Sequence, residues 1–141
     1  MDNMAFRIAL TTLAIAPLIF GIPAIASSSI IELDQKEIHQ LNMLTAEERQ
    51  EQRCDMEAMA QIASADKTFN PDKVIAYTFR DPVVHADMIK APGAVFRSKG
   101  EWYRLKYLCQ TERDGLRVSS FEFTIGSRVH HHDWRRNYLY D

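Results

Sequence analysis

The chain has few cysteines and no surplus of basic residues, and both shortages exclude classes of function. Cys54 and Cys109 are the only cysteines among 141 residues, and they lie far apart, so no CxxC redox chemistry is available. There are 17 lysines and arginines against 19 aspartates and glutamates, which gives a formal net charge of −2. Nucleic-acid-binding domains normally carry a basic surplus or stripe, so the composition argues against that class.

The sequence also lacks the motifs of common enzymes. It has no glycine-rich phosphate loop and no EF-hand pattern. Ser119 and Ser120 lie in a predicted strand without the elbow of serine hydrolases. Asp55 and Glu57 are two positions apart on a predicted helix, so they do not face each other as the paired carboxylates of a glycosidase must. We therefore predict no catalytic residue and no cofactor.

The longest apolar run, residues 8–20, lies near the N-terminus and follows Arg7. Beyond it, Ala24 and Ala26 fit the A-x-A pattern that signal peptidase recognises. We interpret residues 1–26 as a signal peptide that is cleaved before Ser27, which predicts export to the periplasm without a remaining membrane span.

An uncleaved membrane anchor is the alternative to a signal peptide. Pro17, Gly21 and Pro23 interrupt the apolar run, and its uninterrupted part is shorter than the roughly 18–20 residues that a spanning helix needs. The pattern therefore favours cleavage.

Export changes the interpretation of Cys54 and Cys109. In an oxidising compartment two cysteines favour a disulfide over a redox or metal pair. Closing a loop of this length would stabilise the fold by roughly 4 kcal/mol in the chain-entropy model. Two free buried thiols are the alternative.

We divide the exported chain into an N-terminal extension, residues 27–44, and one α+β domain, residues 45–141. Thr45 and Glu48 form a capping-box pattern that predicts the start of a long helix ending near Ala65. A second pattern of this kind, at Asp34 and Glu37, predicts a short helix before it.

The long helix is predicted to be buried from Cys54 onwards. On a helical wheel its apolar arc includes Cys54, Ala58 and Ile62, while Glu57, Gln61 and Ser64 form the predicted solvent stripe.

Asp55 falls inside the apolar arc of this helix, and a buried carboxylate needs a partner or a raised pKa. The favoured interpretation is an ion pair or hydrogen bonds with sheet residues such as Arg97, Arg104 or Lys106. The alternative is a functional acid in a pocket, as in a periplasmic hydrolase-type enzyme.

Period-two patterns predict a curved antiparallel sheet of four to five strands, at residues 74–79, 94–98, 102–111 and 116–125. Residues 83–90 are ambiguous between a short strand and an irregular edge. Pro92 and Gly93 predict a turn.

Two further features of the sheet are predicted. A change of parity at Ser119 and Ser120 predicts a β-bulge or a strand bent around the core. The face of residues 102–111 that carries Cys109 is assigned to the helix, because a disulfide needs Cα atoms within about 7 Å. The predicted fold is therefore α+β, with one long helix tied to the sheet.

Three segments carry a resemblance to a known family: CDMEAM at residues 54–59, AVFRSKGEWYRLKYLC at residues 94–109 and VSSFEFTIG at residues 118–126. Over roughly residues 41–139 the chain resembles the exported bacterial proteins grouped as domain of unknown function 930. The resemblance implies a periplasmic protein of a Gram-negative bacterium with its two cysteines paired. It implies no activity.

The best candidate for ligand binding is the other face of residues 102–111, with Trp102, Arg104 and Lys106, and also Arg97. An aromatic ring beside cations suits a carboxylate, a phosphate or a glycan. The alternatives are a solvated face, or a second small core that Trp102 caps.

His130, His131 and His132 precede Asp133, and two imidazoles with Asp133 or His85 suit Zn²⁺ or Cu²⁺. Consecutive histidines lack the spacing of a committed site, so a solvated polar turn is favoured and no metal site is predicted.

The leading hypothesis is thus a small, non-enzymatic binding or structural module of the cell envelope. Its partner would be an envelope protein, a glycan or a small anionic ligand. A hydrolase-type enzyme near Asp55 and a metal-binding envelope protein using His130 to His132 are the alternatives.

Overall fold

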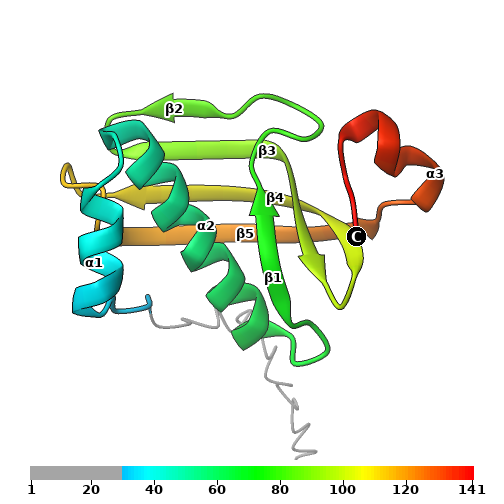
Figure 1. The fold of residues 1–141 in the computed structure, drawn as a ribbon, viewed down its shortest axis with the longest axis horizontal. Coiled ribbons are helices and arrows are strands. Elements are labelled where there is room, and N and C mark those ends of the chain that lie inside the picture. The colour runs from blue at the N-terminus through cyan, green and yellow to red at the C-terminus, as the bar shows by residue number, and fades with distance from the viewer. Residues whose placement is uncertain (1–29) are drawn as a thin grey trace, which may run out of the picture.

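The computed structural model describes residues 30–141, so the predicted signal peptide and its cleavage site before Ser27 lie outside the described residues. Figure 1 shows a long helix crossing one face of a curved antiparallel sheet, which confirms the predicted α+β fold. In chain order the elements are α1 (Gln35–Asn42), α2 (Ala46–Ala65), β1 (Pro71–Ile75), β2 (Val83–His85), β3 (Met88–Ser98), β4 (Glu101–Thr111), β5 (Val118–Arg128), α3 (His131–Trp134) and the 3₁₀ helix η1 (Arg135–Asn137). No helix among these residues is long and apolar enough to cross a membrane.

Both N-terminal helices begin at the predicted capping boxes. The Asp34 side chain accepts from the Glu37 N–H and the Glu37 side chain accepts from the Asp34 N–H, each at 2.8 Å. Thr45 and Glu48 make the same reciprocal pair at the start of α2. These contacts satisfy backbone donors that a helix start otherwise leaves unpaired, so local sequence determines where α1 and α2 begin.

The sheet has the strand order β1-β3-β4-β5, and β2 also pairs with β3. A register shift between Ala91 and Ala94 divides β3, so that β2 pairs with its first half and β1 with its second half. The turn predicted at Pro92 and Gly93 is therefore a β-bulge inside one strand. A Cβ atom at Gly93 would lie 2.2 Å from the Arg80 backbone nitrogen, so only glycine allows this close approach.

The two hairpins after β3 agree with the sequence. Lys99 and Gly100 connect β3 to β4 with φ values of 52° and 78°, the positive angles of a type I′ turn. Between β4 and β5 the pairing shifts from Gln110–Ser120 to Thr111–Val118, which leaves Ser119 as the extra residue. The predicted bulge at Ser119 is confirmed.

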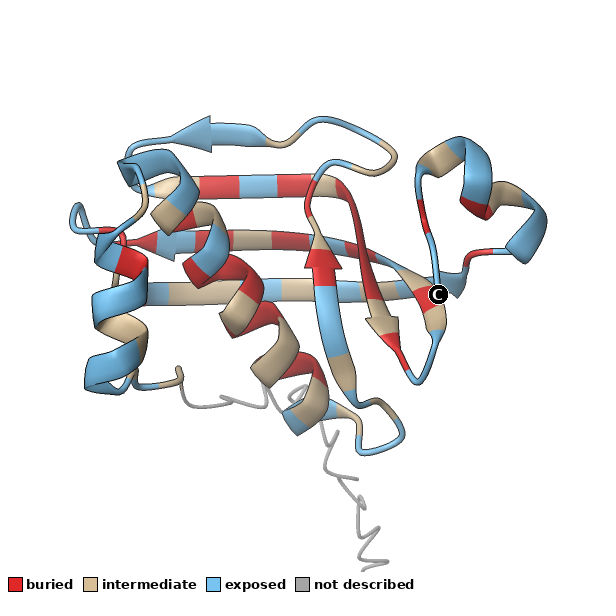
Figure 2. Cartoon of the chain, in the orientation of Figure 1, coloured by how far each residue is buried: buried red, intermediate tan, exposed pale blue. Residues whose placement is uncertain are grey.

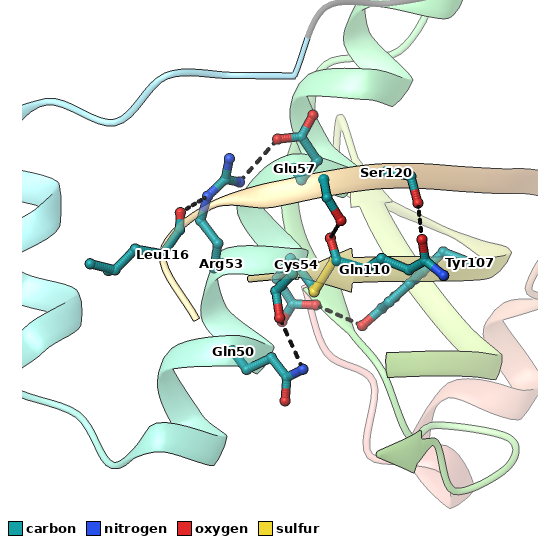
Figure 3. Close-up of a disulfide and its surroundings, with 12 residues drawn as sticks. Gln50, Arg53, Cys54, Glu57, Tyr107, Gln110, Leu116 and Ser120 are labelled. Atoms are coloured by element: carbon teal, nitrogen blue, oxygen red, sulfur yellow. Dashed lines mark hydrogen bonds and ion pairs between the residues drawn. A yellow bond between two sulfur atoms is a disulfide. The ribbon is translucent and has the colours of Figure 1, made fainter. Parts of the chain in front are cut away.

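The main core lies between α2 and the sheet face that carries Cys109, here called the inner face (Figure 2). Cys54, Ala58 and Ile62 of α2 are fully buried against it. Cys54 and Cys109 form the predicted disulfide, with their Cα atoms 5.9 Å apart (Figure 3). The bond therefore joins the middle of α2 to the end of β4.

A second, smaller core lies on the opposite face of the sheet, here called the outer face. Its buried members are Val95, Trp102, Val129, Trp134 and Leu139. Most of the covering residues come from the segment after β5, so the C-terminal end of the chain closes this core.

The solvent stripe predicted on α2 is wrong for two of its three residues. Glu57 is 0% exposed and Gln61 is 5% exposed, whereas Ser64 is exposed. The backbone N–H of Ile31 donates to the Glu57 carboxylate at 3.2 Å, so the segment before α1 lies against this side of α2. A helical wheel describes a single helix and carries no information about a cover that comes from a distant segment.

Candidate functional site

The side chains predicted to bind a ligand are positioned by β4, where alternate residues point to opposite faces. Arg104 pairs across the sheet with Val95, and Lys106 with Thr124. Both are exposed. The period-two pattern thus places these two cations on the outer face, away from α2.

Trp102 shares this face but is only 1% exposed. Its indole N–H donates to the carbonyl oxygen of Tyr140 at 2.9 Å, and Trp134 and Leu139 belong to the same buried cluster. The structure therefore places Trp102 in the second core, the alternative that the sequence left open, and a ligand on the surface does not reach its ring.

Arg104 has an aromatic partner that the sequence did not indicate. Its guanidinium carbon lies 3.7 Å from the centroid of the Phe79 ring. A cation over a ring face is attracted by the negative face of the ring, and this contact holds Arg104 on the outer face without neutralising its charge. No carboxylate forms an ion pair with Arg104 among residues 30–141.

A shallow hollow of about 340 Å³, here called the outer hollow, includes Lys106, which is two residues along β4 from Arg104. It contains the exposed cations Lys90 and Lys106 and one carboxylate, that of Glu122. Its full lining is Lys90, Pro92, Lys106, Tyr107, Leu108, Glu122, Phe123 and Thr124. Neither lysine forms an ion pair within the described part of the chain, so their charges remain available.

Sequence reasoning missed Lys90. Residues 83–90 were ambiguous, and the predicted turn at Pro92 separated Lys90 from the strand that follows. The bulge between Ala91 and Ala94 keeps both parts in β3 and sets Lys90 beside Leu108. No local pattern in the sequence indicates this pairing.

Arg97 does not join the outer hollow. Its guanidinium contacts the two carboxylate oxygens of Asp72 at 2.9 and 3.1 Å. This hydrogen-bonded pair lowers the pKa of Asp72. Arg97 is thus paired with Asp72 of β1, whereas Arg104 and Lys106 form no ion pair among residues 30–141.

Asp55 lies on the inner face and is 7% exposed. Its one hydrogen bond among the described residues comes from the Tyr107 hydroxyl, at 3.3 Å (Figure 3). Burial, and after it the nearby charge of Glu51, raise the pKa of Asp55 to about 8. Burial, and after it the nearby Asp55, likewise raise the pKa of Tyr107.

The interpretation of Asp55 as hydrogen-bonded to a sheet residue is confirmed, but the partner is Tyr107. The three cations named as examples are wrong, because Arg104 and Lys106 point to the other face of the sheet and Arg97 binds Asp72. Asp55 does not line the outer hollow. It is a neutral buried acid at neutral pH.

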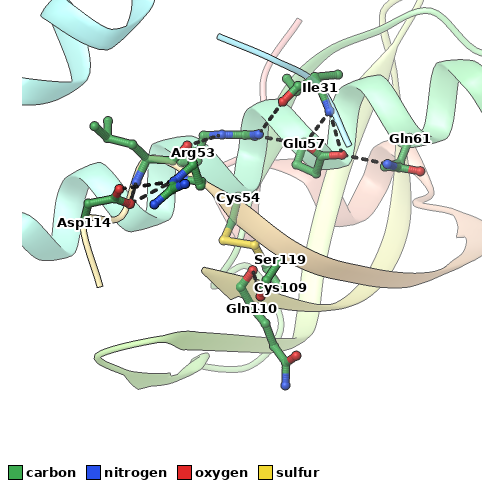
Figure 4. A network of polar contacts seen from close by, with 11 residues as sticks. Ile31, Arg53, Cys54, Glu57, Gln61, Cys109, Gln110, Asp114 and Ser119 are labelled. Carbon is green, nitrogen blue, oxygen red and sulfur yellow. Dashed lines mark hydrogen bonds and ion pairs between the residues drawn. A yellow bond between two sulfur atoms is a disulfide. The ribbon is translucent and has the colours of Figure 1, made fainter. Parts of the chain in front are cut away.

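Glu57 is the other buried carboxylate of α2, and it has a buried cation. Arg53, 1% exposed, bonds to Glu57 at 3.0 Å, and its other donors reach the carbonyl oxygens of Leu116 and Ile31 (Figure 4). Gln61 also donates to Glu57, at 2.6 Å. This network joins α2 to the N-terminal segment and to the start of β5.

A second hollow, of about 610 Å³, opens beside this network and is here called the N-terminal hollow. Its cations are Arg53, which binds Glu57, and Arg117, which binds Glu112 and Asp114. The full lining is Ile30, Ile31, Glu32, Leu33, Ile38, Arg53, Glu112, Asp114, Leu116, Arg117 and Val118. Because both of its cations are already paired, this hollow is less suited to an anion than the outer hollow.

The histidines after β5 surround the start of α3. The rings of His130 and His132 stack with centroids 5.5 Å apart, and His131 contacts Glu101 at 3.0 Å. His132 lies 3.2 Å from Asp133. Within residues 30–141 no group of three or more histidine, cysteine, aspartate or glutamate side chains is arranged to hold a metal ion.

Fold and surface together define a small α+β domain in which a disulfide ties the helix to the sheet, with unpaired cations on the opposite sheet face. The chain belongs to the family described as Domain of Unknown Function (DUF930), whose sequence model matches residues 41–139. None of the curated proteins compared with the chain matches it, and no solved structure does.

Proposed function

We propose that this protein is an exported, periplasmic binding module that holds an anionic ligand on the outer face of its sheet. One observation carries the proposal: Lys90 and Lys106 line the outer hollow, Arg104 is exposed two residues along β4 from Lys106, and none of the three forms an ion pair within residues 30–141. Such cations attract carboxylate or phosphate groups by charge-assisted hydrogen bonds.

The apolar part of the hollow supports binding of a ligand that is more than a bare anion. Leu108 and Pro92 line the hollow together with the two lysines. The Phe79 ring contacts the guanidinium of Arg104 on the same face of the sheet. An apolar surface with a few polar groups around it is the usual composition of a ligand site.

The N-terminal pattern and the buried disulfide support export, since disulfides persist in oxidising compartments. Mass spectrometry of the protein isolated from the periplasm should find Ser27 at the N-terminus. An intact Met1 or Met4 would contradict the proposed cleavage.

Titration with inorganic phosphate, followed by NMR of the protein isolated from the periplasm, tests the binding site. The amide signals of Lys90, Lys106 and their strand neighbours should move together and saturate. Lys90→Ala with Lys106→Ala should weaken binding at least fivefold, because each lysine contributes a charge-assisted contact.

The matched control is Lys73→Ala, which removes an exposed lysine from β1 and should leave phosphate binding unchanged. Equal weakening by the control would mean that phosphate responds to net charge, and the site would be abandoned.

A further inference from the structure

Strand β2 exposes more apolar surface than its place in the fold explains. All three of its residues are exposed, with Val83 at 49% and Val84 at 47%. Successive side chains of a strand point to opposite faces, so burial of one face would cover one of the two valines. Among the described helices and strands β2 packs only against β3, and neither valine is covered.

Val83 adjoins the cations of the proposed binding site, whereas Val84 pairs with the buried Ile89 and points to the other side of the same edge strand. Val83 pairs across the sheet with Lys90, Lys90 with Leu108, and Leu108 with Glu122. One row of side chains across the outer face therefore begins with the exposed Val83 at the sheet edge. It continues with the cation of Lys90 and with Leu108, and it ends at the carboxylate of Glu122. Three strand spacings, about 14 Å, separate Val83 from Glu122.

We propose that the anion bound by Lys90 and Lys106 is the headgroup of an anionic lipid, and that the β2 edge docks on a membrane surface with Val83 and Val84 entering the interface. This inference rests on the proposed function. A free phosphate or carboxylate would use the lysines alone and would leave the valines in water. A lipid surface offers a phosphate layer for the cations and, directly beneath it, an apolar layer for the valines.

Two aspartates set the expected strength of this contact. Asp81 and Asp87 are exposed at the two ends of β2 and would lie nearest to the lipid phosphates. Like charges repel, so docking should be weak and reversible in the native chain. Replacing both aspartates should therefore strengthen it.

Sedimentation with vesicles tests the inference. Vesicles of phosphatidylcholine alone are compared with vesicles that also contain phosphatidylglycerol, using protein isolated from the periplasm. The native chain should bind the second kind and not the first, and added salt should release it, because lysine–headgroup attraction is screened.

The variants should change vesicle binding in opposite directions. Lys90→Glu should weaken vesicle binding at least fivefold, since each lysine near an anionic surface contributes about that factor. Val83→Ser with Val84→Ser should weaken vesicle binding several-fold and leave the phosphate titration unchanged. Asp81→Asn with Asp87→Asn should strengthen vesicle binding. Met43→Ser, which alters an exposed apolar residue at the end of α1, is the control and should have no effect.

The outcomes separate the two proposals. Saturable phosphate binding at Lys90 and Lys106 without vesicle binding, or with unchanged binding by the valine variant, would overturn the lipid inference and keep the anion site. Absence of both kinds of binding would overturn both. Equal binding to the two kinds of vesicle would show that headgroup charge is not recognised, and the lipid inference would fall.

Discussion

Asp55 and Glu57 lie two residues apart on α2 and are both buried, yet the fold accommodates them differently. Glu57 has a buried cation, Arg53, together with donors from Gln61 and the Ile31 backbone. Within residues 30–141 Asp55 has one neutral donor, the Tyr107 hydroxyl, and no cation. Removing a carboxylate from water strongly disfavours its charge unless a partner replaces the water. Glu57 is therefore held within an ion pair, while Asp55 keeps its proton.

The raised pKa of Asp55 makes the free energy of unfolding depend on pH. Well below pH 3.8 both the folded and the unfolded chain carry this proton. As the pH rises, the unfolded chain loses it near the ordinary pKa of 3.8, while the folded chain keeps it until about 8. The unfolded state then binds fewer protons, so the free energy of unfolding falls as pH rises across this window.

Asp55→Asn should remove this dependence. Relative to the variant, the native protein should lose on the order of 5 kcal/mol of stability between pH 4 and pH 8, at about 1.4 kcal/mol for each unit of pKa difference. Urea unfolding at several pH values measures the change. A constant difference between the two proteins from pH 5 to pH 8 would show that Asp55 is ionised in the folded state.

Glu57→Gln should remove the ion pair that distinguishes Glu57 from Asp55. It leaves the guanidinium of Arg53 buried without its counter-charge, a change that costs about 3–5 kcal/mol in free energy of unfolding. Glu47→Gln, an exposed position on the same helix, is the control and should change stability by less than about 0.5 kcal/mol.

A double variant tests whether Glu57 and Arg53 act as a pair. Arg53→Met should itself be destabilising, and Glu57→Gln with Arg53→Met should lose clearly less than the sum of the two single losses. Strictly additive losses in urea unfolding would mean that the two side chains act independently.

Of these substitutions in the two buried networks, Tyr107→Phe should have the smallest effect on stability. It removes the one hydrogen bond to Asp55 and should cost about 1 kcal/mol, the usual net value for such a bond. Because the Tyr107 hydroxyl favours the charged carboxylate, its loss should raise the pKa of Asp55 further, as carbon NMR of the carboxyl group can follow. Tyr103→Phe, on the same face of β4, should leave that pKa in place.

Local features of the fold could be predicted because their causes are local. The capping box at Thr45 and Glu48 determines the start of α2 within one turn. The turn at Gly100 and the bulge at Ser119 follow from backbone preferences and from the change of parity along a strand. The disulfide followed from the presence of only two cysteines and an expected oxidising compartment.

The candidate site was predicted only in part. Arg104 and Lys106 follow from the period of β4, which needs no knowledge of the rest of the fold. Lys90 and Phe79 come from segments whose pairing depends on the bulge in β3 and on the loop packed against Gly93. The C-terminal segment covers Trp102. Its packing against the sheet depends on contacts between residues that are far apart in the sequence.

The sequence by itself determined where α1 and α2 begin, the face on which each β4 residue lies and the two cysteines that pair. It placed the first strand at residues 74–79, whereas β1 is Pro71–Ile75, and it left β2 ambiguous. Tertiary structure alone decided that Glu57 and Gln61 are buried and which groups lie near Asp55. Glu57 and Gln61 are covered because the segment around Ile31 reaches α2, and Asp55 is neutral because Arg104 and Lys106 lie across the sheet from it. Periodicity arises from bonds between near neighbours, whereas burial of a charge depends on which distant groups arrive to replace its water.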